Sequence, residues 1–301
     1  MKYLKFKFES YLIRGAEQAE RLANKLRGAA DRLSTENQVF IADCERTNWE
    51  NVRTCFVLST GRCGTFLLNK ILQTSPNAYP EHKPKPELYR TSKLAYEQID
   101  KNPDLFKEVI KSAREEYLLK AARQKRVFIE TNNQITFFAP IIKDVFPNTT
   151  FIHLVRHPGD FVRSGIRRNW YTGKHDHDIG RIVPISDEIK ERWQEFSLIE
   201  KIGWLWNETN QFIEDFRETL AGDYLLFVKA EELFTDPQVT EKIFKFLYLD
   251  GFQRKKLQKL IQTPVNRQRK GRFSEYKNWT QNNKQQLKNI ATLAEKYGYE
   301  L

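Results

Sequence analysis

The chain has 301 residues, of which 40% are hydrophobic and 13% aromatic, which is enough apolar material for a substantial core and predicts a globular protein. Its formal net charge of +11 indicates an anionic partner: nucleic acid, acidic lipid, or a phosphorylated or sulfated small molecule. Its three cysteines contain no CxxC pair, which argues against a disulfide scaffold and a cysteine zinc site and fits a reducing compartment.

The first predicted element is a basic amphipathic helix over residues 1–35. Apolar side chains recur there at loosely helical intervals among lysines and arginines, at Leu4, Phe8, Leu12, Leu22 and Leu26. We favour packing of this helix on the protein or on a second subunit; peripheral contact of residues 1–33 with an anionic membrane is the alternative. The segment lacks the roughly 20 apolar residues that cross a bilayer, and it lacks a signal-peptide core, so we expect a cytoplasmic protein.

Residues 36–301 are predicted to form one α/β domain. Short runs rich in β-branched and aromatic residues predict strands at 54–59, 126–131, 150–156 and 224–230. Helices are expected at 65–74, 104–123, 137–146, 158–170, 187–220, 238–248, 252–262 and 280–297. This alternation predicts a three-layer, P-loop-like sandwich with a central parallel sheet, in which ligands bind at the carboxyl ends of the strands.

A glycine-bracketed turn, STGRCGTF (59–66), follows the first predicted strand. Gly61 and Gly64 permit positive φ angles and a close approach of backbone N–H groups to a ligand. The next helix directs its positive N-terminal end to the same place, Arg62 adds a bidentate donor, and Thr60 and Thr65 add hydroxyl groups. The turn is therefore predicted to hold a phosphate-like anion, with a plain strand-to-helix connection as the alternative.

This turn differs from a nucleoside triphosphate loop, which reads G-x-x-x-x-G-K-[ST]. The glycines are closer together here and no Lys-Ser/Thr pair follows, which disfavours an ordinary ATPase or GTPase.

A second anion site is predicted in the stretch FIHLVRHPGDFVRSGIRRNW (151–170). Arg156 ends a buried strand, where its charge is costly unless it meets an anion. Pro158 begins a helix whose first turns bring Ser164 back toward the strand end, and Asp160 could hold Arg156 in place. Two such sites on adjacent strand ends suit a nucleoside with phosphate groups at both ends.

These residues resemble the sulfotransferase family. STGRCGTFLLNKIL (59–72) resembles the family's 5′-phosphosulfate loop, and LVRHPGDFVRS (154–164) is similar to its 3′-phosphate motif, R-x-P-x-D-x-x-x-S. NRQRKGRFSEYKNWT (266–280) is similar to the late Arg-Lys-Gly loop that closes over the nucleotide. The resemblance extends over most of the chain from about Thr54 onward, and the three motifs occur in the family's order.

The resemblance implies 3′-phosphoadenosine 5′-phosphosulfate (PAPS) as the sulfuryl donor and adenosine 3′,5′-bisphosphate as a product. The 5′ end of the donor would be held by Thr60, Gly61, Arg62, Cys63, Gly64, Thr65 and Phe66. The 3′-phosphate would be held by Arg156 and Ser164, with a lid formed by Arg269, Lys270 and Gly271. Cys63 stands where Ser is common, and Arg62 replaces the Lys of the soluble small-molecule branch, so the loop resembles the carbohydrate, protein-tyrosine and bacterial branches.

The proline-stiffened segment NAYPEHKPKPELYR (77–90) is expected to cross the cleft and to supply the catalytic base. In the resembled branches a Glu or His base lies at about this offset. Glu81 and His82 both qualify, and we prefer His82 because its ordinary pKa of about 6.5 needs no tuning. Glu87 is a third candidate. The acceptor would be a hydroxyl, less readily an amine, of a small molecule, carbohydrate or glycolipid.

Other residues and functions are weaker candidates. His175, Asp176, His177 and Asp178 are metal-ligand types, but they lie in an apparent loop with no further ligand fixed by spacing, so we expect no metal. Trp204 and Trp206 are expected in the core or beside the adenine. The alternative functions are a nucleotide-binding kinase of P-loop-like fold and a non-catalytic basic binding protein. We expect no nucleic-acid partner.

Overall fold

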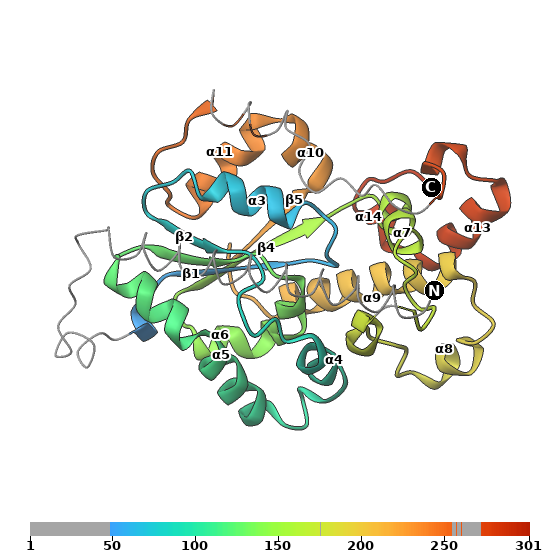
Figure 1. Ribbon diagram of the computed structural model, residues 1–301, viewed down its shortest axis with the longest axis horizontal. Coiled ribbons are helices and arrows are strands. Elements are labelled where there is room, and N and C mark those ends of the chain that lie inside the picture. The colour runs from blue at the N-terminus through green and yellow to red at the C-terminus, as the bar shows by residue number, and fades with distance from the viewer. Residues whose placement is uncertain (1–48, 175, 255–256, 258–259, 261–271) are drawn as a thin grey trace, which may run out of the picture. The chain divides into compact units, whose positions relative to one another are not determined.

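The computed structural model describes residues 49–174, 176–254, 257, 260 and 272–301 (Figure 1). The predicted N-terminal helix (1–35), His175 and the predicted lid residues Arg269, Lys270 and Gly271 lie outside the described residues, as does most of the predicted helix 252–262. The described residues belong to one compact unit, Asn48–Leu301.

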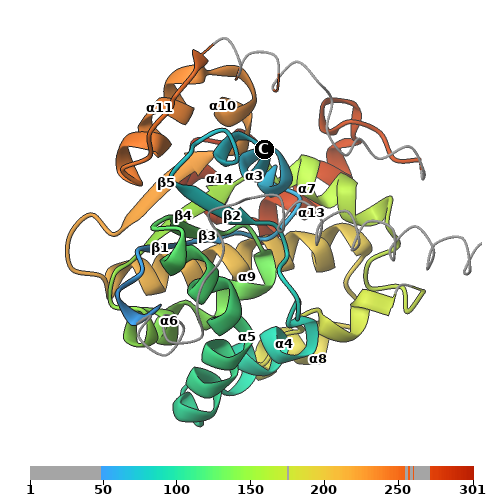
Figure 2. The same ribbon diagram turned by 60° about the vertical axis from the view of Figure 1, so that its left-hand side comes forward.

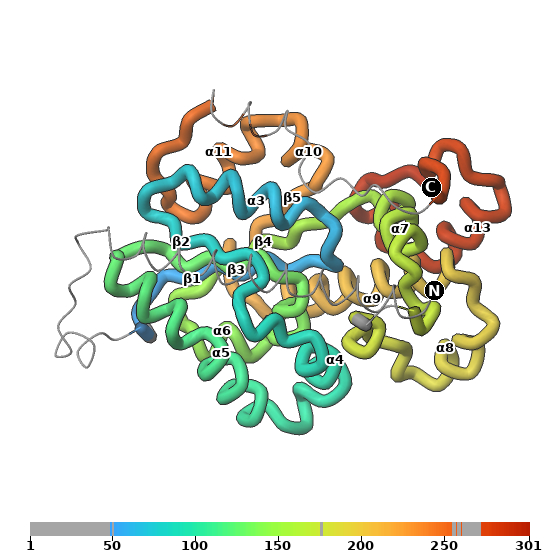
Figure 3. The backbone as a smooth tube through the Cα atoms, viewed as in Figure 1, coloured from blue at the N-terminus to red at the C-terminus, as the bar shows by residue number. Residues whose placement is uncertain are grey.

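A parallel sheet of five strands, in the order β2-β3-β1-β4-β5, forms the middle layer (Figure 1). The strands are β1 (Thr54–Leu58), β2 (Ala78–Glu81), β3 (Val127–Glu130), β4 (Thr149–Val155) and β5 (Leu225–Lys229). Residues of β1 and β3 are buried without interruption, as expected for strands covered on both faces. The chain leaves β1 and β4 at the same edge of the sheet, toward the helices α3 and α7 (Figure 3).

Helices cover both faces of this sheet (Figure 2). On one face, Cys55 and Val57 of β1 belong to the core formed with α3 (Thr65–Leu72), α10 (Ala230–Thr235) and α11 (Pro237–Phe246). On the other face, Phe56 and Leu58 pack with α5 (Pro103–Arg123), α6 (Ala139–Val145) and α9 (Leu198–Glu218). This alternation along one strand confirms the predicted three-layer α/β sandwich.

Shorter elements surround these layers. The remaining α-helices are α4 (Tyr89–Gln98), α7 (Pro158–Ile166), α8 (Asp187–Arg192), α13 (Gln281–Ile290) and α14 (Leu293–Lys296). The 3₁₀ turns are η1 (Trp49–Asn51), η2 (Asn133–Phe138), η3 (Asp176–Gly180) and η4 (Tyr276–Asn278). No helix among the described residues is long and apolar enough to cross a membrane.

Several predicted elements need correction. The segment 78–81, where no strand was predicted, forms β2, and its Pro80 is tolerated because β2 is the edge strand of the sheet. The predicted helix 187–220 is two helices, because Ser197 and Glu200 form a capping box that begins α9 anew. The predicted helix 158–170 ends at Ile166, before Asn169, whose φ of 55° is left-handed.

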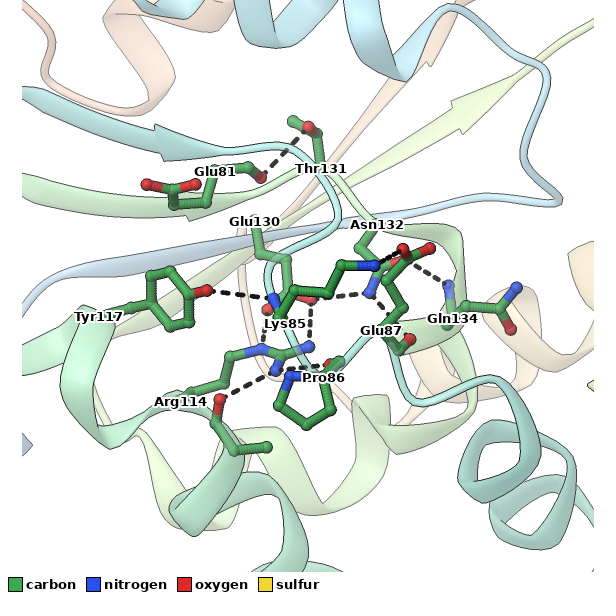
Figure 4. A network of polar contacts seen from close by, with 11 residues as sticks. Glu81, Lys85, Pro86, Glu87, Arg114, Tyr117, Glu130, Thr131, Asn132 and Gln134 are labelled. Atoms are coloured by element: carbon green, nitrogen blue, oxygen red, sulfur yellow. Dashed lines mark hydrogen bonds and ion pairs between the residues drawn. The ribbon is translucent and has the colours of Figure 1, made fainter. Parts of the chain in front are cut away.

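A buried ion pair ties α5 to the end of β3 (Figure 4). The Arg114 Nε and Nη2 groups donate to the two carboxylate oxygens of Glu130, at 2.6 and 2.8 Å, and both side chains are 0% exposed. Arg114 Nη1 donates to the carbonyl oxygen of Pro86 at 3.1 Å, and Asn132 Nδ2 donates to Glu130 at 3.1 Å. The network therefore anchors the segment that follows β2 to the sheet.

We expect Arg114→Met to lower the free energy of unfolding by about 3–5 kcal/mol, because it leaves the Glu130 carboxylate buried without its partner. Urea denaturation followed by circular dichroism measures the change. Lys111→Met is the control: Lys111 lies on the same helix in a partly exposed pair with Glu108 at 3.5 Å, and its loss should cost less than about 1 kcal/mol. Equal losses in the two variants would contradict the structural importance of the buried pair.

Candidate functional site

A cavity of about 910 Å³ lies at the carboxyl ends of the strands. Its walls come from the segments that follow β1, β2, β3 and β4, together with residues beyond α7. Ten residues that the sequence analysis named for the two anion turns and the base line it: Thr60, Gly61, Arg62, Gly64, Thr65, Phe66, His82, Arg156, Asp160 and Ser164. Both predicted anion turns and the preferred base therefore open into one space.

The turn after β1 has the backbone that the sequence predicted. Gly61 has φ +78° and Gly64 has φ +89°, and a Cβ atom at Gly61 would lie 2.9 Å from the Asn133 side chain. Arg62 between them also has a positive φ, of 59°. Because α3 has no side-chain cap at its N-terminus, the N–H groups of its first turn are left for a ligand.

Hydrogen bonds link the two anion turns directly. Arg62 Nε donates to Ser164 Oγ at 3.3 Å, and Arg156 Nη1 donates to the carbonyl oxygen of Arg62 at 3.0 Å. Arg156 Nη2 pairs with Asp160 at 3.1 Å, as predicted, and Trp206 Nε1 donates to the carbonyl oxygen of Arg156 at 2.9 Å. The turns thus form a single cationic site whose arginines are oriented from several sides.

Arg168 adds a charge to this site that the sequence interpretation missed. Its Nη1 group donates to Ser164 Oγ at 2.9 Å, so this hydroxyl accepts from two arginines and keeps its own proton for a ligand. Burial and then the charges of Arg62, Arg167, Arg156 and Arg181 lower the pKa of Arg168 to about 10. Burial and then Arg156 also lower the pKa of Arg62. The spacing of Arg168, one helical turn after Ser164, was the available signal.

Of the three candidate bases, His82 is the one that lines the cavity formed by the described residues. Its Nδ1 atom lies 3.0 Å from Thr131 Oγ1, and its ring meets the edge of Phe66 at 5.2 Å between centroids. Burial, followed by the charge of Lys83, lowers the pKa of His82 below 6.5, so the ring is neutral at pH 7.

The two carboxylates fit the role less well. Glu87 pairs with Lys83 at 3.4 Å and with Lys85; burial raises its pKa, but Lys85, Tyr89 and the charge of Lys83 outweigh burial and lower that pKa to about 2. The carbonyl oxygen of Glu81 accepts from the Thr131 N–H at 2.9 Å, and its side chain does not contribute to the described cavity wall. Figure 4 shows Glu81 beside Thr131 and Glu87 beside Lys85 and Asn132.

Several other residues that the sequence suggested for the site are buried or packed against neighbouring side chains. The Cys63 side chain is buried away from the described cavity wall, its Sγ donates to the carbonyl oxygen of Gly61 at 3.0 Å, and burial raises its pKa to about 11. Trp204 and Trp206 lie in the core. The His177 ring stacks on Tyr89 at 4.4 Å. In the described part of the chain, no group of three or more His, Cys, Asp or Glu residues could hold a metal ion.

Comparison with known proteins agrees with these features. Residues 55–254 match the model of the sulfotransferase family. No curated protein sequence matches the chain at a significant level.

Among the solved structures that this chain matches are the following three. A sulfotransferase from Alicyclobacillus acidocaldarius is 14% identical over 83% of this chain and 97% of its own, with a TM-score of 0.50. A sulfotransferase domain from the curacin biosynthetic pathway is 15% identical over 83% and 99%, also with a TM-score of 0.50. The sulfotransferase domain of the Synechococcus PCC 7002 olefin synthase is 19% identical over 83% and 96%, with a TM-score of 0.47.

The family model covers well over half of the chain and includes both anion turns, the preferred base and the helices between them. The resemblance seen in the motifs is thereby confirmed, and the chain belongs to the sulfotransferase family.

Proposed function

We propose that the protein transfers a sulfuryl group from PAPS to a hydroxyl group of its acceptor, with an amine as the less suitable alternative. The observation that carries the proposal is the direct contact between the two anion turns, in which Ser164 and the Arg62 carbonyl receive the arginine donors. A nucleotide with phosphate groups on its 3′ and 5′ sides matches such a paired site. Family membership disfavours the kinase and the non-catalytic binder considered from the sequence.

The residues of the site fit this donor. Arg62 and the unpaired N–H groups at the start of α3 suit the oxygens of a phosphosulfate, and Arg156 with the Ser164 hydroxyl suits a 3′-phosphate. The crowding of Arg62, Arg156 and Arg168, which lowers the pKa of Arg168, would be relieved by bound anionic charge. When bound, PAPS supplies the activated sulfuryl group, and its bisphosphate departs as an anion.

The protein mainly positions the reactants and stabilises negative charge. Arg62 and the loop N–H groups would face the oxygens of the transferred group and of the leaving phosphate. They are preorganised by the glycine conformations and by the bonds to Ser164 and Arg156, so little reorganisation is needed during reaction.

His82 would accept the proton of the acceptor hydroxyl. The Thr131 hydroxyl lies 3.4 Å from the carbonyl oxygen of Glu81, to which it can donate. It then accepts from His82 Nδ1–H at 3.0 Å, which leaves the lone pair of Nε2 for the acceptor proton. The positioning of the base thus depends on a threonine at the end of β3.

We expect adenosine 3′,5′-bisphosphate to bind with micromolar affinity and without added metal, and Arg156→Ala to weaken that binding by about tenfold to a hundredfold. Isothermal titration calorimetry measures both affinities. The matched control is Arg53→Ala. Exposed Arg53 precedes β1 at the amino end of the strands, away from the cavity, so its loss should leave the affinity unchanged. Binding of MgADP in place of the bisphosphate would instead favour a kinase.

We expect His82→Ala to retain bisphosphate affinity and to lower turnover by about 10²–10⁴-fold, as measured with radiolabelled PAPS and an acceptor found by screening. Glu81→Gln is the comparison and should stay near wild-type turnover; if it lost activity while His82→Ala kept it, the base would be Glu81.

The pH dependence follows from the same group. His82 must be unprotonated to act, and its pKa lies below the ordinary value of 6.5, so kcat/KM should be constant above that pH and fall as the pH drops through a lower midpoint. A pH profile of the wild-type enzyme checks this, and a midpoint above 6.5 would contradict the assignment.

A further inference from the structure

Part of the cavity wall is built from two segments that are distant in the sequence, 82–89 and 170–182. The Tyr89 ring stacks on His177, and Gly180 packs so closely on Tyr89 that an added Cβ would lie 2.8 Å from the Tyr89 carbonyl oxygen. This close packing holds Arg181, the next residue, at the same cavity as Arg62 and Ser164.

The side chain of Arg181 is fixed in position, although only one of its nitrogen atoms donates a hydrogen bond to the described residues. Its guanidinium carbon lies 3.9 Å from the centroid of the Trp170 ring, and its Nε donates to Asp178 Oδ1 at 2.7 Å. The side chain is 14% exposed. Its two Nη groups make no hydrogen bond with any described residue, although they belong to a side chain that lines the cavity. Such a fixed guanidinium presents a planar set of N–H donors that matches an oxyanion.

Lys83 contrasts with Arg181 at this wall. Its ammonium group pairs with Glu87 at 3.4 Å and donates to the Tyr89 hydroxyl at 2.9 Å. Both cations are paired with a carboxylate, but Lys83 donates to two protein groups, whereas Arg181 donates to one through Nε and keeps its Nη donors for a ligand.

The charge balance of the whole cavity points the same way. Among the described residues that line it, seven are lysine or arginine and two, Asp160 and Glu275, carry carboxylates. Arg62, Arg156 and Arg168 are joined at the donor end through Ser164 and the Arg62 carbonyl, and Arg181 takes no part in those bonds. Burial lowers the pKa of Arg181, although its bond to Asp178 acts in the opposite direction. A bound anion would offset the effect of burial, because it favours the charged form of the guanidinium group.

We propose that Arg181, stacked on Trp170, binds an oxyanion of the acceptor, so that the acceptor is a hydroxylated organic anion carrying a carboxylate, sulfate or phosphate of its own. This inference rests on the proposed function, because it concerns the second substrate of that reaction. Acidic sugars are one class of such anions, because a sugar acid or a sugar sulfate carries both hydroxyl groups and an oxyanion.

The test uses glycosides that share the 4-nitrophenyl group and the pyranose ring and differ in the substituent at C6, which is anionic or neutral. With the donor site filled by saturating adenosine 3′,5′-bisphosphate, the protein is titrated calorimetrically with 4-nitrophenyl glucuronide and with 4-nitrophenyl glucoside. The 6-sulfate and 6-phosphate of the glucoside distinguish the kind of oxyanion. We expect at least one anion to bind about tenfold to a hundredfold more tightly than the neutral glucoside.

Three variants assign this preference to the side chain. Arg181→Gln should abolish it, and Arg181→Lys, which keeps the charge but loses the planar fork, should keep part of it. Arg192→Gln removes an equal charge from an exposed position outside the described cavity wall and should keep all of it. Bisphosphate affinity, measured in each variant, shows that the fold and donor site are intact.

The outcomes separate the two proposals. If the wild-type protein fails to bind the bisphosphate, the proposed function falls. If the bisphosphate binds but the neutral glucoside binds as tightly as every anion, or no member of the set binds, the assignment of Arg181 is overturned. It is also overturned if Arg181→Gln weakens bisphosphate binding, because Arg181 would then serve the donor.

Discussion

The parallel direction of the five strands is the constraint that assembles the site. Because the strands all run in the same direction, the segments after β1, β2, β3 and β4 begin at the carboxyl end of the sheet. Those segments carry the glycine turn, His82, Thr131 and Arg156. Arg62 and Ser164, which are 102 residues apart in the chain, come into hydrogen-bonding contact for this reason.

Neutral oxygen atoms orient several of the arginine side chains at the two predicted anion turns. Arg156 bonds to the Arg62 carbonyl, and Arg168 bonds to the carbonyl and hydroxyl oxygens of Ser164. Such acceptors orient a guanidinium group without cancelling its charge, so the field that an anion meets remains positive. Asp160, which pairs with Arg156, provides a partial counter-charge at 37% side-chain exposure. The site is thus rigid and still electropositive.

The sequence was sufficient where a local pattern determines the backbone. Continuous apolar runs predicted β1 and β4, and glycines beside a helix start predicted the positive-φ turn between β1 and α3. Sequence-based prediction failed where contacts between distant segments or a local cap determine an element. Pro80 argued against the strand at 78–81, and the capping box at Ser197 divided one expected helix into two. Arg181 gave no signal, because its significance depends on Trp170 and Asp178 folding around it. The choice among three candidate bases likewise depended on burial and pairing, which a linear pattern does not contain.

Because β2 is an edge strand, the part of the site that it supports is easier to deform than the part supported by β1 and β4. β1 and β4, which end in the two predicted anion turns, each have strands on both sides, whereas β2, which leads to His82, is bonded to β3 alone. Local opening of an edge strand costs less than opening the centre of a sheet. Under the proposed function, the half of the site that would bind the acceptor can therefore loosen, or accumulate substitutions over evolution, while the half that would bind the nucleotide keeps its geometry. One scaffold of this kind can change its second substrate without rebuilding the site for its first.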